Sequence, residues 1–416
     1  MTPSYPIRAI EPDEFTAFCA VPGQAFNSSH PPAEAQELDL ITFEFDRSAA
    51  AFDGDQIVGT SCAFTFRLSV PGGQAACGGV SFVAVLPTHR RRGIMSAMLR
   101  HLLTDIAARG EPVAALFASE PEIYGRFGFG CASEDLRLTI PRGDGRLIPP
   151  APGPAGQPAP RLRFAEPEQV RDGLAAVYAT VAARRPGLMA RDDRWWQARI
   201  ADPQWARNGS APTRWVVAED DSGLRGYASY SVQPEWSPDG IPASQLRVIE
   251  LMAVDPGATA ALWTDLLTRD LVGEVRASQR PVDDELLIML AGRRRARTSL
   301  VDGLWVRLTD VPAALSQRQY AREVDVVIEV TDDLLPANSG RWRLRADASG
   351  QGTCESSNKG ADLLAPVQTL GAAYLGGARL GQLAAAGRLV EQRPGALAEL
   401  SAAMLWDPAP WTPMIF

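Results

Sequence analysis

Hydrophobic and polar positions in the first part of the chain follow two different periods. Residues 56–68 and 79–85 are strand-like and flank the turn Pro71, Gly72 and Gly73, which predicts a β-hairpin. Between residues 94 and 106 apolar side chains recur at helical spacing, and Gly110 ends the predicted helix. The apolar run 113–118 then predicts a buried strand, so the order is strand, loop, helix, strand.

A stretch rich in proline and glycine, residues 140–160, loses this periodicity and marks a first domain boundary. Beyond it, residues 167–183 and 191–201 predict helices, and residues 214–218, 226–232 and 246–254 predict strands. The second region extends to residue 297 and has the pattern of a second α/β layer.

The two regions contain a weak internal repeat. Residues 83–87 resemble residues 252–256, and residues 93–103 resemble 257–267 in their initial glycine and apolar spacing. Residues 88–92, with three arginines, have no counterpart in the second region. We interpret the pattern as a duplication with one active copy; the alternative is a chance similarity between two strand–helix junctions.

From residue 301 onward the pattern changes to a third domain. Residues 324–330, 340–346 and 352–357 predict strands, and residues 363–374, 380–385 and 395–403 predict helices. The tail, residues 406–416, contains three prolines and ends on Phe416. Prolines restrict backbone freedom, so this terminus is expected to be stiffer than most.

Composition narrows the class of protein. A chain of 416 residues exceeds the roughly 250 to 300 residues that one core serves, and 46% hydrophobic residues can fill several cores. Five scattered cysteines without CxxC spacing and three histidines indicate neither a disulfide framework nor a metal site. The net charge of −8 argues against general nucleic-acid binding and mildly favours cationic partners. With neither a signal-like start nor a long apolar run, we expect no membrane span and a cytoplasmic protein.

The junction at residues 83–96 has the pattern of a phosphate-binding loop. A strand ends, a basic run and Gly93 turn the chain, and a helix begins at once, which directs free backbone N–H groups toward one point. Arg91 and Arg92 add positive charge, and guanidinium groups suit phosphate geometry. A basic run is by itself more often a solvated face; the strand before it and the helix after it favour the phosphate loop.

Tyr124 is the candidate for acid chemistry. It follows the predicted strand 113–118 by a short polar link and precedes the glycine-spaced run 125–130. A tyrosine hydroxyl can protonate a departing thiolate in a largely dry site. A tyrosine after a strand is more often a packed residue, so position alone does not decide between the two interpretations.

The motif V-x-V-x-P-x-x-R-x-x-G-I in residues 83–94 resembles the acetyl-CoA-binding motif of the GNAT acetyltransferases. It departs from that motif at Met95, where a second small residue is usual, with Ser96 beside it. The resemblance implies that the chain uses acetyl-CoA as co-substrate and no metal. The residues that it assigns to acetyl-CoA binding are Val83, Ala84, Val85, Arg91, Arg92, Gly93, Ile94, Met95, Ser96, Ser119 and Glu120.

Read together, residues 89–93, 118–120 and 123–130 resemble the Eis (enhanced intracellular survival) branch of the GNAT superfamily. Residues 185–187, Trp195, Trp196 and the terminal phenylalanine extend the resemblance over nearly the whole chain. It implies tandem GNAT domains of the α+β or α/β class, with mixed sheets flanked by helices, and a sterol-carrier-protein-like α/β domain. The expected ranges are 1–145 for the active GNAT domain, 161–297 for a degenerate one and 301–416 for the third domain.

By this resemblance Tyr124 is the general acid and the α-carboxylate of Phe416 is the general base. The family implies a homohexamer that acetylates amines of small cationic molecules such as aminoglycosides. Family enzymes can carry an acidic residue before the terminal aromatic, where this chain has Ile415. A protein-lysine or peptide acetyltransferase and a non-catalytic protein that binds lipid or another hydrophobic ligand are the alternatives.

Overall fold

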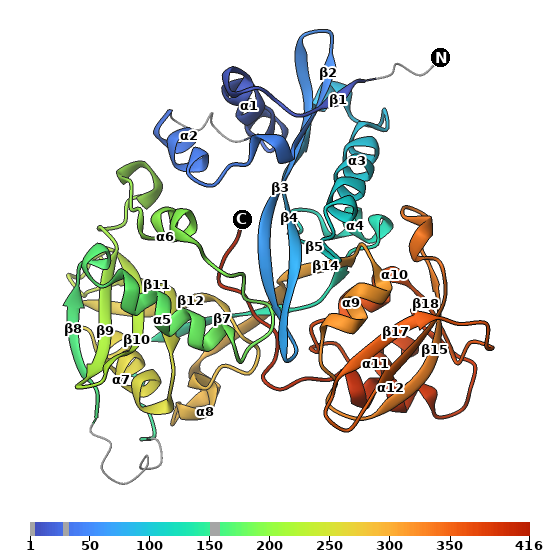
Figure 1. Ribbon diagram of the computed structural model, residues 1–416. Helices are drawn as coiled ribbons and strands as arrows, with labels where there is room; N and C mark the ends of the chain where they lie inside the picture. The colour runs from blue at the N-terminus through green and yellow to red at the C-terminus, as the bar shows by residue number, and fades with distance from the viewer. Residues whose placement is uncertain (1–4, 28–32, 150–158) are drawn as a thin grey trace. The chain divides into compact units, whose positions relative to one another are not determined.

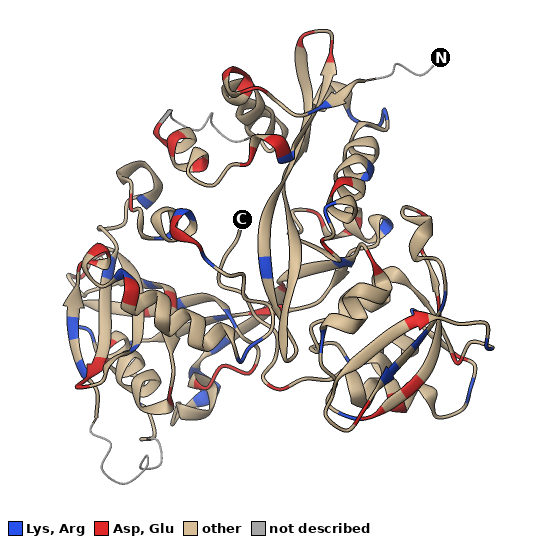
Figure 2. Ribbon diagram, viewed as in Figure 1, with Lys and Arg blue, Asp and Glu red and all other residues tan. Residues whose placement is uncertain are grey.

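The computed structural model describes residues 5–27, 33–149 and 159–416 (Figure 1). The chain divides into two compact units. Unit 1 comprises Met1–Ser133, Gly303–Pro410 and Met414–Phe416, and unit 2 comprises Glu134–Asp302 and Trp411–Pro413. Positively and negatively charged residues are scattered over the elements of both units (Figure 2). No helix among the described residues is long and apolar enough to cross a membrane.

The first sheet of unit 1 has seven strands in the order β1-β2-β3-β4-β5-β14-β6. Its strands are β1 (Ile7–Arg8), β2 (Ser48–Asp53), β3 (Gln56–Val70), β4 (Gly73–Val85), β5 (Val113–Phe117), β6 (Gly130–Cys131) and β14 (Leu304–Leu308). Its helices are α1 (Phe15–Ala25), α2 (Ala33–Leu40), α3 (Ile94–Ala108) and α4 (Pro121–Tyr124). The parallel pair β4 and β5 is connected through α3, and the other neighbouring pairs are antiparallel.

The hairpin predicted from the sequence is present, but β4 begins at Gly73 rather than at residue 79. The small residues of its first half lack the side chains that identify a strand, yet packing requires them. A Cβ at Gly78 would lie 2.6 Å from Cδ1 of Ile106 on α3, and one at Gly79 would collide with the ring of Phe66. The absence of bulky residues therefore reflects close packing on both faces of β4.

β4 and β5 separate where the hairpin carries a bulge. Their register pairs are confined to residues 77–79 of β4 and 113–115 of β5 within the described chain. Opposite the β3 residues 60–62, β4 contains one extra residue, and Phe82 has a φ of 54°. The Thr60 hydroxyl donates a 2.7 Å hydrogen bond to the Phe82 carbonyl and holds the bulge. On the side of β5, the backbone groups of β4 beyond Gly79 therefore have no strand partner, while the pairing with β3 continues.

The sheet of unit 2 repeats this arrangement in the order β13-β7-β12-β11-β10-β9-β8. Its strands are β7 (Glu134–Pro141), β8 (Arg161–Ala165), β9 (Arg214–Asp220), β10 (Gly223–Gln233), β11 (Ser244–Ala253), β12 (Val272–Arg280) and β13 (Arg297–Asp302). Its helices are α5 (Arg171–Ala182), α6 (Asp193–Ile200), α7 (Pro256–Leu267) and α8 (Leu286–Met289). The parallel pair β11 and β12 is connected through α7, and β11 also carries a bulge, against β10. The repeat seen in the sequence thus corresponds to two related sheets.

The remaining part of unit 1 is a five-stranded sheet in the order β17-β16-β15-β18-β19. Its strands are β15 (Val324–Thr331), β16 (Gly340–Ala346), β17 (Gly352–Ser356), β18 (Leu363–Pro366) and β19 (Val390–Glu391). Its helices are α9 (Val311–Gln317), α10 (Val367–Ala373), α11 (Leu380–Ala385) and α12 (Ala396–Met404).

The predicted helix 363–374 is wrong over its first four residues, which form β18 parallel to β15. Pro366 explains the difference. A residue before proline is driven to extended backbone, so the helix starts only at Val367.

Two strands belong to sheets that their sequence position does not suggest. β7, inside the expected first domain, pairs with β12 and β13 in the sheet of unit 2. β14, inside the expected third domain, pairs with β5 and β6 in the first sheet of unit 1. Periodicity along the chain identifies a strand but not the sheet that it joins. Residues 150–158 of the expected boundary stretch lie outside the described residues.

Candidate active site

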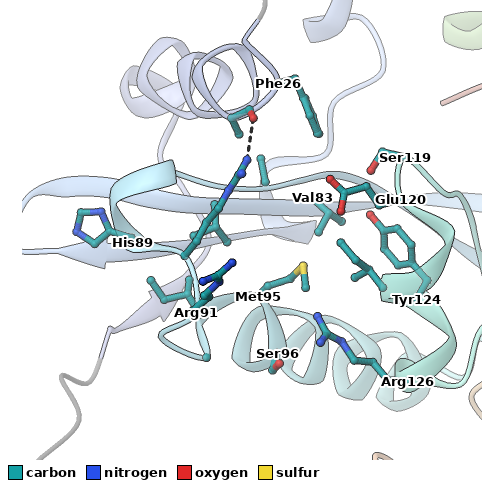
Figure 3. Close-up of a pocket in the computed structure, with 17 residues that line it drawn as sticks. Phe26, Val83, His89, Arg91, Met95, Ser96, Ser119, Glu120, Tyr124 and Arg126 are labelled. Atoms are coloured by element: carbon teal, nitrogen blue, oxygen red, sulfur yellow. Dashed lines mark hydrogen bonds between the residues drawn. The ribbon is translucent and has the colours of Figure 1, made fainter.

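A cavity of about 430 Å³ opens in unit 1 where β4 parts from β5. Residues of strands, helices and loops from four places in the chain line it (Figure 3). The lining residues are Ala25, Phe26, Val83, Ala84, Val85, His89, Arg90, Arg91, Gly93, Ile94, Met95, Ser96, Ser119, Glu120, Ile123, Tyr124 and Arg126. The cavity brings together ten of the eleven residues that the sequence assigns to acetyl-CoA; Arg92 is the exception.

The loop before α3 presents unoccupied backbone N–H groups. Gly93 is the N-cap of α3 with a φ of 82°, and no side chain caps this end. The first helical hydrogen bond runs from Ala97 N to Gly93 O, so the amides of the first turn have no helical partner. Arg91 also takes a positive φ, 62°. Three free amides at the positive end of a 15-residue helix are therefore able to bind an anion.

The basic residues of the loop have different roles. Arg91 projects into the cavity from the loop, and Arg126 approaches it from the other side, near Met95 (Figure 3). Arg90 donates a 2.8 Å hydrogen bond to the carbonyl of Ala25 and ties the loop to α1. Arg92, expected to contact acetyl-CoA, instead donates to the hydroxyl of Tyr5 at 2.8 Å and does not line the cavity.

Met95, where the GNAT motif usually has a small residue, lies half-buried at the start of α3. Its sulfur points into the cavity, whereas the neighbouring Ser96 hydroxyl points toward the opposite side of the helix (Figure 3). A flexible thioether can move aside for a ligand more readily than a branched side chain. The departure at Met95 therefore narrows the cavity without closing it.

Tyr124 ends the short helix α4 with its ring buried and its hydroxyl in the cavity. The residue is 4% exposed, and its ring contacts Phe129 edge-on at 6.2 Å between centroids. Burial raises the pKa of Tyr124, a hydrogen bond with the Ser119 side chain partly opposes this, and the charge of Glu120 adds to the rise. The phenol therefore stays protonated at neutral pH and can donate a proton.

Phe416 is held within unit 1 by aromatic contacts. Its ring lies 4.9 Å from that of Phe66, 5.7 Å from Phe117 and 6.4 Å from Phe64, measured between centroids. A Cβ at Gly79 would lie 3.0 Å from this ring. Since β4 and β5 cease to pair at Gly79, the terminal residue lies beside the point where the two strands separate.

The equivalent helix in unit 2 has no free anion site. Asp255 caps α7, and its carboxylate accepts a 3.0 Å hydrogen bond from the N–H of Ala258. The same carboxylate forms an ion pair with Arg225 at 2.8 Å. A protein carboxylate thus already binds one N–H at the start of α7, and Pro256 at the first helical position has no N–H to offer. Without the basic loop, this helix start offers a phosphate fewer donors and less positive charge than α3 does.

Several residues at the cavity were not found from the sequence. Phe26 follows α1, is 53% exposed and presents its ring to the cavity (Figure 3). Ile123 and Arg126 flank Tyr124, but no spacing rule points to them. The glycine run after Tyr124 has a packing role: a Cβ at Gly130 would collide with the Gln368 carbonyl of α10. The described residues contain no group of three His, Cys, Asp or Glu side chains arranged around a metal.

Three family descriptions match the chain. Residues 6–132 and residues 187–308 each match an acetyltransferase (GNAT) domain, and residues 311–413 match a sterol carrier protein domain. With the two bulged sheets and the loop before α3, these matches define a tandem GNAT N-acetyltransferase with a sterol-carrier-like domain. The fold class expected from the sequence is confirmed.

Relatives narrow the class further. The chain is 43% identical to an uncharacterised N-acetyltransferase of Streptomyces avermitilis over 98% of each protein. It is 37% identical to N-acetyltransferase Eis of Mycobacterium tuberculosis over 85% of this chain and 84% of that protein. The crystal structure of Eis1 from Mycobacterium abscessus covers 99% of this chain and all of that one, with a TM-score of 0.83 and 31% identity. The chain belongs to the Eis family of GNAT N-acetyltransferases, whose fold implies the use of acetyl-CoA.

Proposed function

We propose that the chain transfers the acetyl group of acetyl-CoA to an amine of a small cationic molecule, aminoglycoside-like in its charge. In this proposal Tyr124 is the general acid and the α-carboxylate of Phe416 is the general base. The observation that carries it is the buried ring and cavity-facing hydroxyl of Tyr124, opposite the free amides of α3.

The cofactor contacts follow from the cavity. The amides at the start of α3 and the guanidinium of Arg91 would bind the pyrophosphate, since both supply donors and positive charge. Backbone groups of β4 from Val83 to Val85 that have no partner in β5 would hold the pantetheine arm. The thioester would then lie where β4 and β5 separate, beside Tyr124.

The reaction requires two proton movements. As the amine nitrogen bonds to the thioester carbon, its excess proton passes to the Phe416 carboxylate, directly or through a water molecule. As the carbon–sulfur bond breaks, the Tyr124 phenol protonates the departing thiolate. An ordinary α-carboxylate has a pKa near about 3.5, so its position next to the amine matters more than its basicity.

The proposed cationic substrate and the proposed assembly rest on the charge of the chain and on its relatives. A net charge of −8 favours encounter with cations. The resemblance to Eis enzymes supports self-association into a hexamer of 44.8 kDa chains and a cytoplasmic location. Light scattering on the purified protein measures the assembly directly, and a monomer would contradict it.

The test of this function is a thiol-release assay with acetyl-CoA and a panel of aminoglycosides, polyamines and lysine peptides. Tyr124→Phe and a chain lacking Phe416 are expected to lower kcat by about 10²-fold or more, the usual contribution of an acid or base. Wild-type rates in both variants for every accepted amine would contradict the catalytic assignment. Faster turnover of lysine peptides than of any small amine would contradict the substrate class.

A further inference from the structure

Arg307 on β14 is a fully buried arginine with only part of its guanidinium group paired. Its Nη2 donates hydrogen bonds of 2.8 and 2.7 Å to the two carboxylate oxygens of Asp332. Its Nε and Nη1 are buried and have no hydrogen-bond partner among the described residues. A buried ion pair adds little stability, and unpaired buried donors reduce it. Stability alone therefore does not account for an arginine at this position.

Asp332 fixes the guanidinium to the sterol-carrier-like domain. Its carboxylate accepts hydrogen bonds from the backbone N–H groups of Leu334 and Leu335 at 3.1 and 3.0 Å. It also accepts one of 2.9 Å from Nδ2 of Asn338, which is 2% exposed. With these partners the carboxylate has little freedom to rotate, so the position of Arg307 is fixed as well.

The turn that follows Tyr124 contacts this guanidinium. Gly128 has a φ of 82°, and a Cβ there would lie 2.6 Å from Nη1 and 2.8 Å from Cζ of Arg307. The Gly128 N–H donates to the Gly125 carbonyl at 3.0 Å. The next N–H, of Phe129, donates to the Tyr124 carbonyl at 3.3 Å. The backbone of Tyr124 is thus connected to the guanidinium through one short turn, and only a glycine allows this approach.

Helix α10 of the sterol-carrier-like domain packs on other parts of the same turn. A Cβ at Gly125 would lie 2.8 Å from Nε2 of Gln368, and one at Gly130 would collide with the Gln368 carbonyl. Gly130 in β6 also pairs with Val306, the residue before Arg307 in β14. Residues 125–130 are therefore held by β14 and α10, all within unit 1.

The hydroxyl of Tyr124 meets an exposed residue, whereas its ring meets a buried one. The hydroxyl has a hydrogen bond with the side chain of Ser119, which is exposed. The ring is buried against Phe129. A displacement of about 1 Å at a reacting group can lower a rate about 10²-fold, so the turn must hold the ring closely.

We propose that Arg307 and Gly128 are positioning residues for Tyr124. The guanidinium supports the turn from Gly125 to Gly128 and thereby sets where the phenol meets the departing sulfur. The sterol-carrier-like domain holds Arg307 through Asp332 and so contributes to the placement of the acid. The inference rests on the proposed role of Tyr124 as general acid.

Gly128→Ala tests it, with Gly110→Ala as the matched control. Both glycines lie in unit 1 with positive φ, 82° and 75°, so both substitutions carry the left-handed penalty. A Cβ at Gly110 meets nothing within 4 Å, whereas one at Gly128 meets Arg307. Each substitution is made in the wild-type chain and in Tyr124→Phe, and rates are measured with the amine that the wild type acetylates fastest.

Gly128→Ala is expected to lower kcat about tenfold or more, with Gly110→Ala near wild type. Affinity for acetyl-CoA, measured by calorimetry, is expected to stay unchanged, because the amides before α3 lie outside the turn. In the Tyr124→Phe chain Gly128→Ala is expected to cause no further loss, since the ring that it displaces no longer donates a proton. An equal further loss in both chains would indicate general damage and overturn the proposal.

Arg307→Lys is a second variant should Gly128→Ala fail to fold. Lysine can keep the ion pair with Asp332 but lacks the planar group that Gly128 contacts. Its kcat is expected to fall in the wild-type chain and not to fall further in the Tyr124→Phe chain. A wild-type kcat in Arg307→Lys would overturn the role of the guanidinium.

The outcomes separate the two proposals. If Tyr124→Phe slows transfer but Gly128→Ala and Arg307→Lys do not, the positioning role is wrong and the acid assignment stands. If Tyr124→Phe has no effect, both are overturned. An equal effect of Gly128→Ala and Gly110→Ala would also overturn the positioning role.

Discussion

The environment of Tyr124 differs sharply between its ring and its hydroxyl. The ring is buried against Phe129, while the hydroxyl reaches exposed Ser119 and Glu120. Because burial raises its pKa, Tyr124 is expected to ionise only above about pH 10. Absorbance of tyrosinate, compared between wild type and Tyr124→Phe, measures this ionisation. A Tyr124 that ionises below pH 9 would contradict the account.

The same shift has a consequence for stability. The folded pKa of Tyr124 exceeds its unfolded value, so its contribution is complete below about pH 10 and is lost as pH rises through the folded pKa. The difference in melting temperature between wild type and Tyr124→Phe is therefore expected to stay constant from pH 7 to 9. Above pH 10 it is expected to shift in favour of the phenylalanine variant.

Ile415 offers a test of substrate charge. It is 62% exposed, directly before Phe416, so replacing it costs little stability. Ile415→Glu is expected to lower KM for polyamines up to about fivefold, the scale of one exposed ion pair, and to do so less in high salt. Ile415→Gln is the neutral control. An equal change in both variants would show that charge is not the cause.

For individual residues, the sequence predicts a position in the site where a local motif fixes the backbone, and not elsewhere. Gly93 could be located because a strand, a turn and a helix follow one another directly, whereas the role of Tyr124 was assigned through the resemblance to the Eis family. The tie between Arg92 and Tyr5 could not be predicted, because it joins residues 87 positions apart. Phe26 reaches the cavity from α1 through tertiary packing alone.

Among the helices and strands, α3 allows stability and acetyl-CoA binding to be tested separately, through the glycines at its two ends. Gly93 and Gly110 bracket this helix, both have positive φ, and a Cβ at either meets nothing within 4 Å. Alanine at each should cost about 1 to 2 kcal/mol of stability through backbone strain. Only Gly93→Ala is expected to weaken acetyl-CoA binding, by about tenfold, because only Gly93 shapes the anion site. Calorimetry on both variants measures this, and equal affinities would contradict it.

Local pattern also explains which elements could be predicted. The ranges of β16 and α11 agree with the sequence because clear apolar spacing and turn residues bound them. The first half of β4 and all of β18 were missed, because glycines and a proline hide the strand pattern there. The exchange of β7 and β14 between sheets depends on long-range pairing, which periodicity does not encode.

For the whole molecule, the differences between the two related GNAT sheets predict that only the sheet in unit 1 binds acetyl-CoA. Of the two equivalent helices, α3 in unit 1 has an uncapped start with basic residues around it, whereas Asp255 caps α7 in unit 2 and accepts from the N–H of Ala258. Calorimetry is therefore expected to give one acetyl-CoA per chain. Asp255→Ala should lower the stability of unit 2 by about 1 kcal/mol through loss of the cap, without adding a second site. Two equivalents bound to the wild type would contradict this asymmetry.

The central claim is that the free amides before α3 hold the pyrophosphate of acetyl-CoA with its thioester beside Tyr124. A crystal structure of the protein with bound coenzyme tests it most directly. The account predicts phosphate density within hydrogen-bond distance of the Gly93 to Ser96 backbone and sulfur near the Tyr124 hydroxyl. Phosphate density at α7 in unit 2, or sulfur remote from Tyr124, would contradict it.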